Sequence, residues 1–347
     1  MAMGVDVTIR GAGIFGLSIA WVFLRKGATV RVVDPHGPGA GSSGGIVGAL
    51  APHVPEAWNA KKAFQLESLL MAEAFWTGVA ATGGRDPGYL RSGRLQPLAD
   101  ARAVELARER AVGAAALWQG RAVWEVVEAV DPDWHPLSPT GLHVRDTLTA
   151  RLHPGQACAA LVAAISARGG TVVGEAGDEG AVIHATGAAG LQVLNTAFGR
   201  SVGTGVKGQA ALLRLDRRAA PQLFCDGVHV VPHGDGTVAV GSTSERDFDD
   251  PARVDGQLDA VIAKARAAVP ALRDAEVIRR WAGVRPRARS RAPLLGPWPG
   301  RPGHFIANGG FKIGFGMAPK VAHVMAELVL DGKDAVPEGF RTDEALG

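Results

Sequence analysis

The chain has 347 residues and a formal net charge of +3, with 47% hydrophobic and 20% charged residues. These values are ordinary for a globular protein and exclude extensive disorder, and the length predicts two domains or one large domain with an insertion. Two cysteines, Cys158 and Cys225, are too few for a disulfide scaffold or a multi-cysteine metal centre, so we expect no metal site.

The sequence shows no signal-peptide pattern and no run of about 18 apolar residues, so we expect a cytoplasmic protein without a membrane span. Of the 37 basic residues 29 are arginine, but they form no long basic run with interleaved aromatic residues, and nucleic-acid binding is not indicated. The one basic cluster, Arg285, Arg287, Arg289 and Arg291, alternates with other residues. In an extended strand this period of two places all four side chains on one face.

Hydrophobic periodicity and turn residues predict the elements in chain order. The N-terminal part contains a strand at 5–10, a helix at 15–26, a strand at 28–34 and, after a loop rich in glycine and serine, a helix at 58–80. The middle contains a strand at 90–97, a helix at 100–119 with Asp100 as N-cap, a helix at 149–168, and strands at 171–174 and 181–186. A meander between 206 and 243 precedes a helix at 250–269, strands at 277–283 and 305–307, and a helix at 316–330.

This order predicts an α/β fold, α+β overall, in which a Rossmann-type domain is interleaved with an antiparallel-sheet domain. Alternating helices and strands mark residues 1–85, 146–200 and 283–347, which we expect to form a discontinuous nucleotide-binding domain. Antiparallel patterns mark residues 86–145 and 201–282, which we expect to form the substrate domain.

Gly11, Gly13 and Gly16 form a Gly-x-Gly-x-x-Gly pattern between the first strand and the first helix. Gly11 permits a tight turn, Gly13 lets the backbone approach a pyrophosphate, and Gly16 lets the helix pack closely on the strand. The helix N-terminus then offers free N–H groups to phosphates. Asp34 ends the next strand, 23 residues after Gly11, where a carboxylate can bind ribose hydroxyls. The pattern therefore predicts a dinucleotide site.

The loop after Asp34 favours a flavin dinucleotide. Residues 39–48 are small, which lets the backbone run against a flat ring system, and the serines can bind phosphate. The alternative is a flexible surface loop. The loop runs directly into the apolar segment 46–50, and this continuation disfavours the surface alternative.

Five stretches together resemble the FAD-dependent amine and amino-acid oxidoreductases, the family of D-amino acid oxidase and dehydrogenase, glycine oxidase and sarcosine oxidase. They are the glycine pattern with Asp34, the loop 43–48, the tripeptide 185–187, the segments 281–286 and 293–296, and the loop 308–314 with 318–319. The resemblance extends from Val5 to about Gly332 and looks closest to the glycine oxidase branch in the final third. The loop 43–52 is also similar to the FAD domain of a bacterial enzyme that trims a tRNA wobble modification.

The resemblance implies FAD as cofactor. Because no cysteine follows Cys225, where some relatives attach the flavin, we expect the FAD to be non-covalent. The implied cofactor-binding residues are Gly11, Gly13, Ile14, Phe15, Gly16, Asp34, Ser42, Ser43, Gly44, Gly45, Ile46, Val47, Thr186, Gly187, Gly309, Gly310, Phe311, Lys312, Ile313 and Gly314. In the family the last glycine loop follows the pyrimidine edge of the flavin, where Lys312 can stabilise the charge of the reduced ring; the alternative is a solvated loop lysine.

The resemblance implies three catalytic residues: Arg285, His229 and Lys312. The family's arginine at the position of Arg285 clamps the substrate carboxylate, and the alternative is a structural ion pair. Relatives commonly carry a tyrosine where this chain has His229, so the imidazole is expected either to bind the carboxylate or titrate, or to be a surface histidine. For His53, beyond the flavin loop, a structural turn is favoured over the active site.

The family's chemistry implies oxidation of the C–N bond of a small amino acid or N-substituted glycine, by hydride transfer to flavin N5 and hydrolysis of the imine. The expected partners are a small carboxylate-bearing substrate and an electron acceptor, either oxygen or a respiratory carrier. Residues 208–263 lack the lysine that sarcosine-type oxidases place near the flavin, which favours a dehydrogenase. The alternatives are a 2-hydroxy acid dehydrogenase, a tRNA wobble-modification enzyme, and an FAD-binding subunit of a larger complex.

Overall fold

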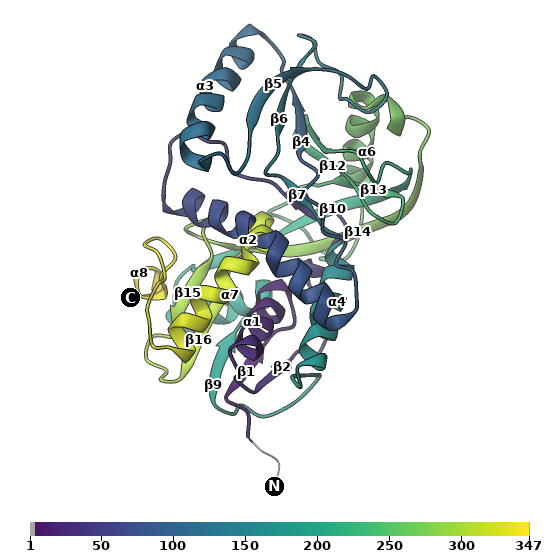
Figure 1. Cartoon of the computed structure of the whole chain (residues 1–347). Coiled ribbons are helices and arrows are strands. Elements are labelled where there is room, and N and C mark those ends of the chain that lie inside the picture. The colour runs from purple at the N-terminus through teal and green to yellow at the C-terminus, as the bar shows by residue number, and fades with distance from the viewer. Residues whose placement is uncertain (1–3, 347) are drawn as a thin grey trace.

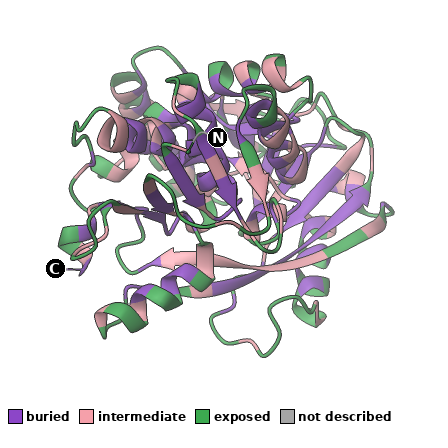
Figure 2. Ribbon diagram, turned by 90° about the horizontal axis from the view of Figure 1, so that it is seen from below, coloured by how far each residue is buried: buried purple, intermediate pink, exposed green. Residues whose placement is uncertain are grey.

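The structure is a computed structural model that describes residues 4–346. It contains a six-stranded sheet in the lower part of Figure 1, an eight-stranded sheet in the upper part, and a two-stranded sheet between them. Seen from below, buried strands occupy the middle of the molecule and exposed residues lie on the helices and loops around them (Figure 2). This mixed architecture confirms the predicted α/β fold class.

The six-stranded sheet has the strand order β15-β16-β9-β1-β2-β8, and only β15 is antiparallel to its neighbour. Its strands are β1 (Val7–Arg10), β2 (Val30–Val33), β8 (Thr171–Val173), β9 (Ala181–His184), β15 (Leu294–Pro297) and β16 (His304–Asn308). The central strands are rich in valine and isoleucine because both faces of a parallel sheet are covered. The carboxyl ends of β1 and β9 lie side by side, which places the glycine pattern next to the segment that follows β9.

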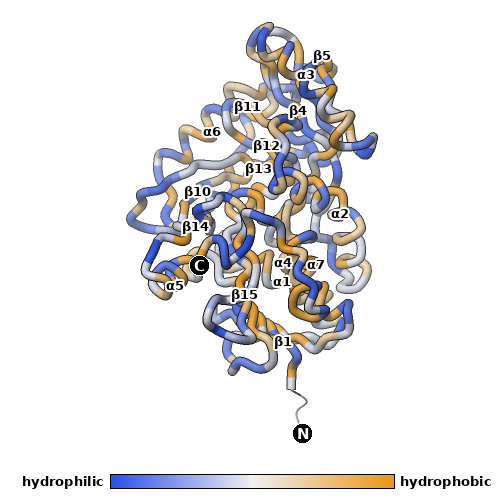
Figure 3. Tube along the Cα trace, turned by 90° about the vertical axis from the view of Figure 1, so that its left-hand side faces the viewer, coloured by the Kyte–Doolittle hydropathy of each residue, from blue (hydrophilic) through white to orange (hydrophobic). Residues whose placement is uncertain are grey.

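Helices cover the two faces of this sheet. On one face lie α1 (Ile14–Arg25), α4 (Pro154–Ala167) and α7 (Gly314–Leu330), with α2 (Ala60–Gly83) packed over α4 and α7. Hydrophobic residues gather where α1, α4 and α7 meet β1 (Figure 3). The helix α5 (Gly187–Phe198) lies on the other face. Ile306 of β16 packs against α5, whereas the next residue, Ala307, packs in the cluster that contains α1, α4 and α7.

The segment Phe311–Leu330 is, by length and composition alone, apolar enough to cross a membrane. It comprises a 3-10 turn and α7, and α7 packs against α1 and α2. Burial in this core accounts for its apolar sequence.

The eight-stranded sheet has the order β14-β10-β13-β12-β11-β4-β6-β5, with one parallel pair, β11 with β4. Its strands are β4 (Arg94–Pro97), β5 (Trp124–Glu128), β6 (Leu142–Asp146), β10 (Gly203–Arg214), β11 (Gln222–Cys225), β12 (Val228–Pro232), β13 (Thr237–Gly241) and β14 (Glu276–Ala288). The outer face packs against α6 (Gly256–Ala268) through residues such as Ala211 and Leu213. The inner face, with Ala210 and Val231, packs against Ile46 of the predicted flavin loop.

Several element boundaries differ from the predictions. Asp100 caps α3 (Ala101–Trp118) as predicted, accepting from Ala103 N–H at 2.8 Å. The predicted helix at 149–168 begins only at Pro154, because β7 (Ala150–Arg151) pairs with β3 (Ala49–Leu50). The sequence patterns did not define β5, β6, α5, β15 and α8 (Thr342–Leu346) as separate elements.

Sheet membership supports the proposal of two interleaved domains. The six-stranded sheet takes its strands from the segments 1–85, 146–200 and 283–347. The eight-stranded sheet takes its strands from the other two segments, except that β14 continues past 283 to Ala288 and β6 ends at Asp146. Because β14 is shared between segments, it carries the segment 281–286 toward the six-stranded layer, where Arg287 pairs with Gly310 of the last glycine loop.

Candidate active site

The first glycine turn is shaped by close backbone contacts. Gly11 has φ +106°, and a Cβ there would lie 2.4 Å from the carbonyl oxygen of Ala185. A Cβ on Gly16 would lie 1.9 Å from the carbonyl oxygen of Gly11. Only glycine fits both positions, so the ends of β1 and β9 and the start of α1 converge, and the N-terminus of α1 is left open to a ligand.

Ser43 and Asp34 hold this turn through backbone N–H groups. Ile14 N–H donates to Ser43 Oγ at 2.9 Å, and Ala12 N–H donates to Asp34 Oδ2 at 2.8 Å. His36 N–H donates to Asp34 Oδ1 at 3.0 Å. Each carboxylate oxygen of Asp34 retains a further acceptor position, so the side chain can fix the turn and still accept from a ribose hydroxyl.

The predicted flavin loop lies against the inner face of the eight-stranded sheet. A Cβ on Gly45 would lie 3.4 Å from Cη2 of Trp281, and a Cβ on Gly241 would lie 2.8 Å from Cγ2 of Val47. Ile46 is fully buried, and its carbonyl oxygen accepts from His233 Nε2–H at 2.8 Å. The loop therefore bridges the dinucleotide turn and the inner face, and is ordered rather than a flexible surface loop.

The last glycine loop closes the same region from the other side. A Cβ on Gly310 would lie 2.8 Å from Cζ of Phe15, and one on Gly314 would lie 3.6 Å from Cγ2 of Ile14. The N-termini of α1 and α7 are therefore adjacent, and the first turn of a helix has N–H groups without partners inside the helix. Asn308 connects the loop to the start of α5, since its Nδ2–H donates to Gly187 O at 3.0 Å.

The predicted cofactor residues are thus brought together from five segments that are distant in sequence. A cradle that tolerates no Cβ, two open helix N-termini and an acid at the end of β2 fit a dinucleotide. The small residues of the loop 39–48 fit a flat ring between that cradle and the inner face.

Arg285 lies at the end of this inner face. Its Nη2–H donates to Ser242 Oγ at 2.6 Å and its Nη1–H to Thr243 O at 3.3 Å. Within residues 4–346 no carboxylate forms an ion pair with it, so the structural ion pair considered from the sequence is not what the structure shows. Burial lowers the pKa of Arg285 to about 10, with the charge of Glu245 opposing this, and the side chain stays cationic at neutral pH.

A row of directly paired residues crosses the inner face of the sheet, in the order Trp281, Ala210, Gly241, His229, Phe224. The two small residues at positions 210 and 241 form a floor with aromatic rings on both sides. The rings of His229 and Phe224 are 4.6 Å apart between centroids. Trp281 therefore stands three strands, about 14 Å, from His229, and Ile46 and Val47 of the flavin loop pack on the small residues between them.

His229 faces this floor and is not an exposed surface histidine. Its Nδ1 is enclosed and has no hydrogen-bond partner among the described residues. Burial, followed by the charges of Arg94, Lys312 and Arg285, lowers the pKa of His229 to about 3. The imidazole is therefore neutral at physiological pH and can donate or accept a hydrogen bond, but it does not titrate there.

Two further predicted residues have contrasting positions. Lys312 lies with Nζ 5.7 Å from the ring centroid of Phe311, and burial, followed by the charge of Arg285, lowers its pKa. His53 is tied to Gln65, whose Oε1 accepts from its backbone N–H at 2.8 Å and also contacts its Nδ1. This supports the structural turn that was favoured for His53.

Four residues near Arg285 and His229 were missed by sequence reasoning: Gly208, Ser242, Arg94 and Phe224. Arg94 Nε–H donates to the buried Asp146 at 3.0 Å, and its Cζ lies 5.9 Å from the ring centroid of Phe224. The strand periodicity of the meander could have placed Phe224 on the face of His229, but the other three depend on long-range pairing.

The arginine row at the end of β14 does not form one exposed patch. Arg285 is turned toward Ser242, and Cζ of Arg287 lies 5.8 Å from the ring centroid of Phe311. Arg289 and Arg291 are exposed. A continuous RNA-binding surface is therefore not present in this row.

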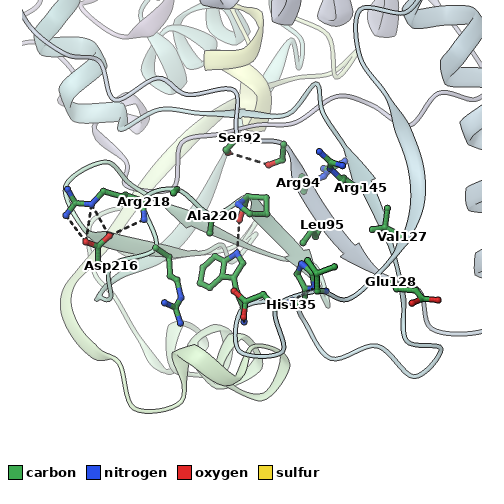
Figure 4. Close-up of a pocket in the computed structure, with 17 residues that line it drawn as sticks. Ser92, Arg94, Leu95, Val127, Glu128, His135, Arg145, Asp216, Arg218 and Ala220 are labelled. Atoms are coloured by element: carbon green, nitrogen blue, oxygen red, sulfur yellow. Dashed lines mark hydrogen bonds and ion pairs between the residues drawn. The ribbon is translucent and has the colours of Figure 1, made fainter.

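A cavity of about 700 Å³ lies elsewhere, between β4, the segment 127–135 and the segment 216–221 (Figure 4). Trp134 forms part of its wall, and its Nε1–H donates to Pro221 O at 2.9 Å. Arg218 pairs with Asp216 at 2.7 Å on the opposite side. None of the predicted site residues lines this cavity.

Comparison with known proteins decides the family. The family model described as FAD dependent oxidoreductase matches residues 6–328. The chain belongs to this family. The resemblance stated from the sequence and the assignment of FAD as cofactor are confirmed by this match.

Proteins whose sequences are similar to this FAD-dependent oxidoreductase are themselves named as oxidases or oxidoreductases. It is 30% identical to the glycine oxidase of Pseudomonas aeruginosa over 132 residues, which are 38% of this chain and 36% of that protein. It is 29% identical to the putative thiamine biosynthesis oxidoreductase ThiO of Rhizobium etli over 342 residues, which are 93% of this chain and 96% of that protein. The match to the first relative spans little more than a third of its length.

Solved structures share the fold of this FAD-dependent oxidoreductase. The glycine oxidase from Geobacillus kaustophilus superposes with a TM-score of 0.81 at 21% identity, covering 96% of each chain. The iminodiacetate oxidase from Chelativorans sp. BNC1 superposes with a TM-score of 0.84 at 23% identity, covering 96% of this chain and 98% of that one. At these identities the likeness concerns the fold.

Proposed function

We propose that this FAD-dependent oxidoreductase oxidises the C–N bond of a small amino acid or N-substituted glycine. The observation that carries the proposal is the guanidinium of Arg285, which has no carboxylate partner among residues 4–346 and lies on the inner face of the sheet, over Gly208. Guanidinium groups grip carboxylates bidentately, and a partly buried cation without a paired carboxylate favours an anionic ligand.

In this proposal the chain's own groups bind and orient the substrate. Arg285 holds the carboxylate, and Ser242 and Thr243 fix the guanidinium by accepting two of its hydrogen bonds. Neutral His229 gives the carboxylate a further hydrogen bond from the floor of the sheet. Positioning of this kind contributes a large part of the rate enhancement when reacting atoms are held in line.

The cradle of Gly11, Gly13 and Gly16, with Ser43, would hold the diphosphate of FAD, and the loop 308–314 with the N-terminus of α7 would lie beside the ring. Bound FAD supplies the acceptor for the hydride that leaves Cα while the amine lone pair forms an imine, which water then hydrolyses to a carbonyl compound and an amine. Backbone N–H groups at the start of α7 stabilise negative charge near the ring.

The electron acceptor is proposed to be a carrier rather than oxygen. Residues 208–263 contain no lysine, and the nearest strand lysine, Lys207, lies on the opposite face of β10 from Gly208. Its Nζ is 3.6 Å from Glu245, within a buried network that points away from the flavin loop. A cytoplasmic location, expected from the sequence, is also part of the proposed function.

The test is anaerobic reduction of the FAD-loaded protein. Addition of D-amino acids, glycine, sarcosine and 2-hydroxy acids, one at a time, should bleach the flavin absorbance for at least one amine. If only 2-hydroxy acids bleach it, the enzyme is a hydroxy acid dehydrogenase, and if no compound does, the proposal fails. Stopped-flow reoxidation by air and by a quinone then identifies the class of acceptor.

A further inference from the structure

The pairing of β10 with β13 becomes irregular next to the proposed carboxylate-binding arginine. The two strands pair regularly as far as Ala210 and Gly241. The next residue of β10, Gln209, exchanges hydrogen bonds with Thr243, so Ser242 is an extra residue between two successive pairs. An extra residue of this kind is a β-bulge, which bends the strand and redirects its side chains, and bulges are frequent beside active sites.

This bulge, Ser242 with Thr243, supplies both acceptors for the guanidinium of Arg285. Ser242 Oγ accepts from Nη2–H at 2.6 Å, and Thr243 O accepts from Nη1–H at 3.3 Å. The guanidinium lies over Gly208 of β10 and reaches the bulge from there. Its orientation therefore depends on the conformation of the bulge.

The hydroxyl of Thr243 connects the bulge to β10. Thr243 N–H donates to Gln209 O at 3.2 Å, and Thr243 Oγ1 accepts from Gln209 N–H at 2.7 Å. In a regular hydrogen-bonded pair the second acceptor is the backbone carbonyl oxygen. Because the hydroxyl takes its place, the carbonyl oxygen of Thr243 is left for Arg285.

Glu245 holds this hydroxyl from the outer face of the sheet. Its Oε1 accepts from Thr243 Oγ1–H, and also from Gln209 Nε2–H at 3.0 Å. Its Oε2 lies 3.6 Å from Nζ of Lys207, and the side chains of Lys207 and Glu245 are only 4% and 5% exposed. Gln209 Oε1 in turn accepts from the N–H of Asp255, the N-cap of α6, at 2.8 Å. A buried carboxylate in such a network has a fixed position, and it determines where the Thr243 hydroxyl points.

We propose that Glu245 is a positioning residue for Arg285 and acts through the hydroxyl of Thr243. This rests on the proposed role of Arg285 in binding the substrate carboxylate. Without the Glu245 carboxylate the Thr243 hydroxyl loses its acceptor, and the Thr243 carbonyl oxygen can return to Gln209 N–H as in a regular ladder. The guanidinium then loses one of its two acceptors, and its bidentate contact with a carboxylate weakens.

The experiment measures how strongly the FAD-loaded protein prefers a carboxylate over the corresponding amide. Methoxyacetate and methoxyacetamide have similar shapes, differ in charge, and carry no amine to be oxidised. The Kd of each is read from the perturbation of the flavin spectrum, and the ratio of the two values cancels effects that weaken both ligands equally. We expect the wild type to bind methoxyacetate about 10- to 100-fold more tightly, and Arg285→Ala to reduce this preference to about threefold or less.

Glu245→Ala should reduce the preference about fivefold, because Arg285 remains but is no longer oriented. Thr243→Val should have the same effect, although it preserves the side-chain volume and the buried pair of Glu245 with Lys207. This second variant keeps the test available if Glu245→Ala does not fold.

Glu245→Gln should retain the preference, because its side-chain oxygen still accepts from the Thr243 hydroxyl. Its Tm should nevertheless fall, since the buried Lys207 loses its nearest carboxylate. A merely structural role of Glu245 predicts instead that preference and Tm change together. Glu276→Ala is the matched control, because Glu276 lies on β14, pairs with Arg214 at 2.9 Å and is exposed. It removes the same charge away from the bulge and should keep the wild-type preference.

Two outcomes would overturn the positioning role. One is a wild-type preference in both Glu245→Ala and Thr243→Val. The other is a further fall in preference when Glu245→Ala is added to Arg285→Ala, because two residues that act on one contact should not have additive effects.

The same measurements separate this role from the proposed function. If the wild type shows no preference for the carboxylate, or Arg285→Ala keeps it, Arg285 does not bind the carboxylate, and the positioning role fails with it. If Arg285→Ala removes the preference but the variants at 243 and 245 keep it, the role proposed for Arg285 stands and that of Glu245 fails.

Discussion

The guanidinium of Arg285 lies directly over the Cα of Gly208, so that a Cβ at Gly208 would be 1.9 Å from Nη2. Gly208 is on β10, paired with Gly283 of β14, and the side chain of Arg285 crosses β10 to reach Ser242 after β13. A side chain at position 208 would occupy the path of the guanidinium. Gly208 is therefore a positioning residue for the proposed carboxylate clamp.

Gly208→Ala should displace Arg285 while leaving the FAD cradle intact. We expect kcat/KM to fall about 10- to 100-fold, since a misplaced charge-assisted contact of about 1.5–3 kcal/mol is lost. Flavin content and steady-state kinetics on one preparation measure the effect. Gly256→Ala is the control, because a Cβ there meets nothing within 4 Å, and it should retain activity. Unchanged kcat/KM in Gly208→Ala would show that the guanidinium does not need this path.

Arg285→Ala should lower kcat/KM roughly 30- to 1000-fold, because a bidentate charge-assisted pair of about 2–4 kcal/mol is removed. FAD should remain bound, since the dinucleotide turn is separate from Arg285. Arg285→Lys should recover part of the loss, because a point charge cannot reproduce the planar fork. Loss of flavin and of Tm together with an unchanged KM would instead indicate a structural role.

His229→Phe should raise KM about 10- to 100-fold, because the hydrogen bond that is lost goes to an ionised carboxylate and is worth about 1.5–3 kcal/mol. His229→Tyr should restore most of the affinity, since a phenolic O–H can donate from the same floor position. Since the pKa of His229 is lowered to about 3, the pH profile of kcat/KM in the wild-type protein should show no limb from this residue between pH 5 and 8. A limb near pH 6.5 that disappears in His229→Phe would contradict the neutral imidazole.

Gly16→Ala should abolish tight FAD binding. A Cβ there would be 1.9 Å from the carbonyl oxygen of Gly11, so the start of α1 must move away from the turn that receives the diphosphate. Purified protein should contain little flavin, and added FAD should raise its Tm less than that of the wild type. In Gly177→Ala, which lies outside the site, the new Cβ meets nothing within 4 Å, and the flavin content should be normal.

The dinucleotide turn was predictable from the sequence because its determinants are local. The spacing of Gly11, Gly13 and Gly16 between a strand and a helix predicts which backbone positions must lack a Cβ. In the structure a Cβ on Gly11 or on Gly16 would collide with a backbone carbonyl oxygen, as the pattern requires. The Asp100 cap was predictable for the same reason, since an N-cap acts within its own turn.

The environment of Arg285 was not predictable, because it is assembled by pairing between distant strands. Nothing in the local sequence of Gly208 or Ser242 indicates that a guanidinium from β14 lies between them. The short strands β5 and β6 are also weakly patterned, and they are defined by pairing with each other across the connection between them. Tertiary pairing decides such elements more than propensity does.

His233 makes the protein sensitive to acid through the flavin loop. His233 is fully buried, and its Nε2–H donates to Ile46 O. Its pKa is lowered to about 4, chiefly by burial. The positive charges of His153 and Arg151 lower this pKa further, whereas Asp235 and the hydrogen bond to Ile46 raise it. Because the pKa of the folded state lies below the ordinary value of 6.5, the unfolded chain binds the proton first. Stability is therefore complete above about pH 6.5 and is lost as the pH falls toward 4. From pH 7 to 5 this residue alone should cost about 2 kcal/mol of unfolding free energy.

His233→Gln removes the titrating group but keeps an N–H donor near Ile46. We expect the variant to be less stable than the wild type at pH 7, yet to lose about 2 kcal/mol less between pH 7 and 5. Urea denaturation of the FAD-loaded proteins at both pH values measures the difference. His184 and His229, whose pKa values are lowered to about 4 and about 3, remain in both proteins and contribute the same background slope. If the two proteins lose equal stability over this range, the proton taken up on acid unfolding does not go to His233.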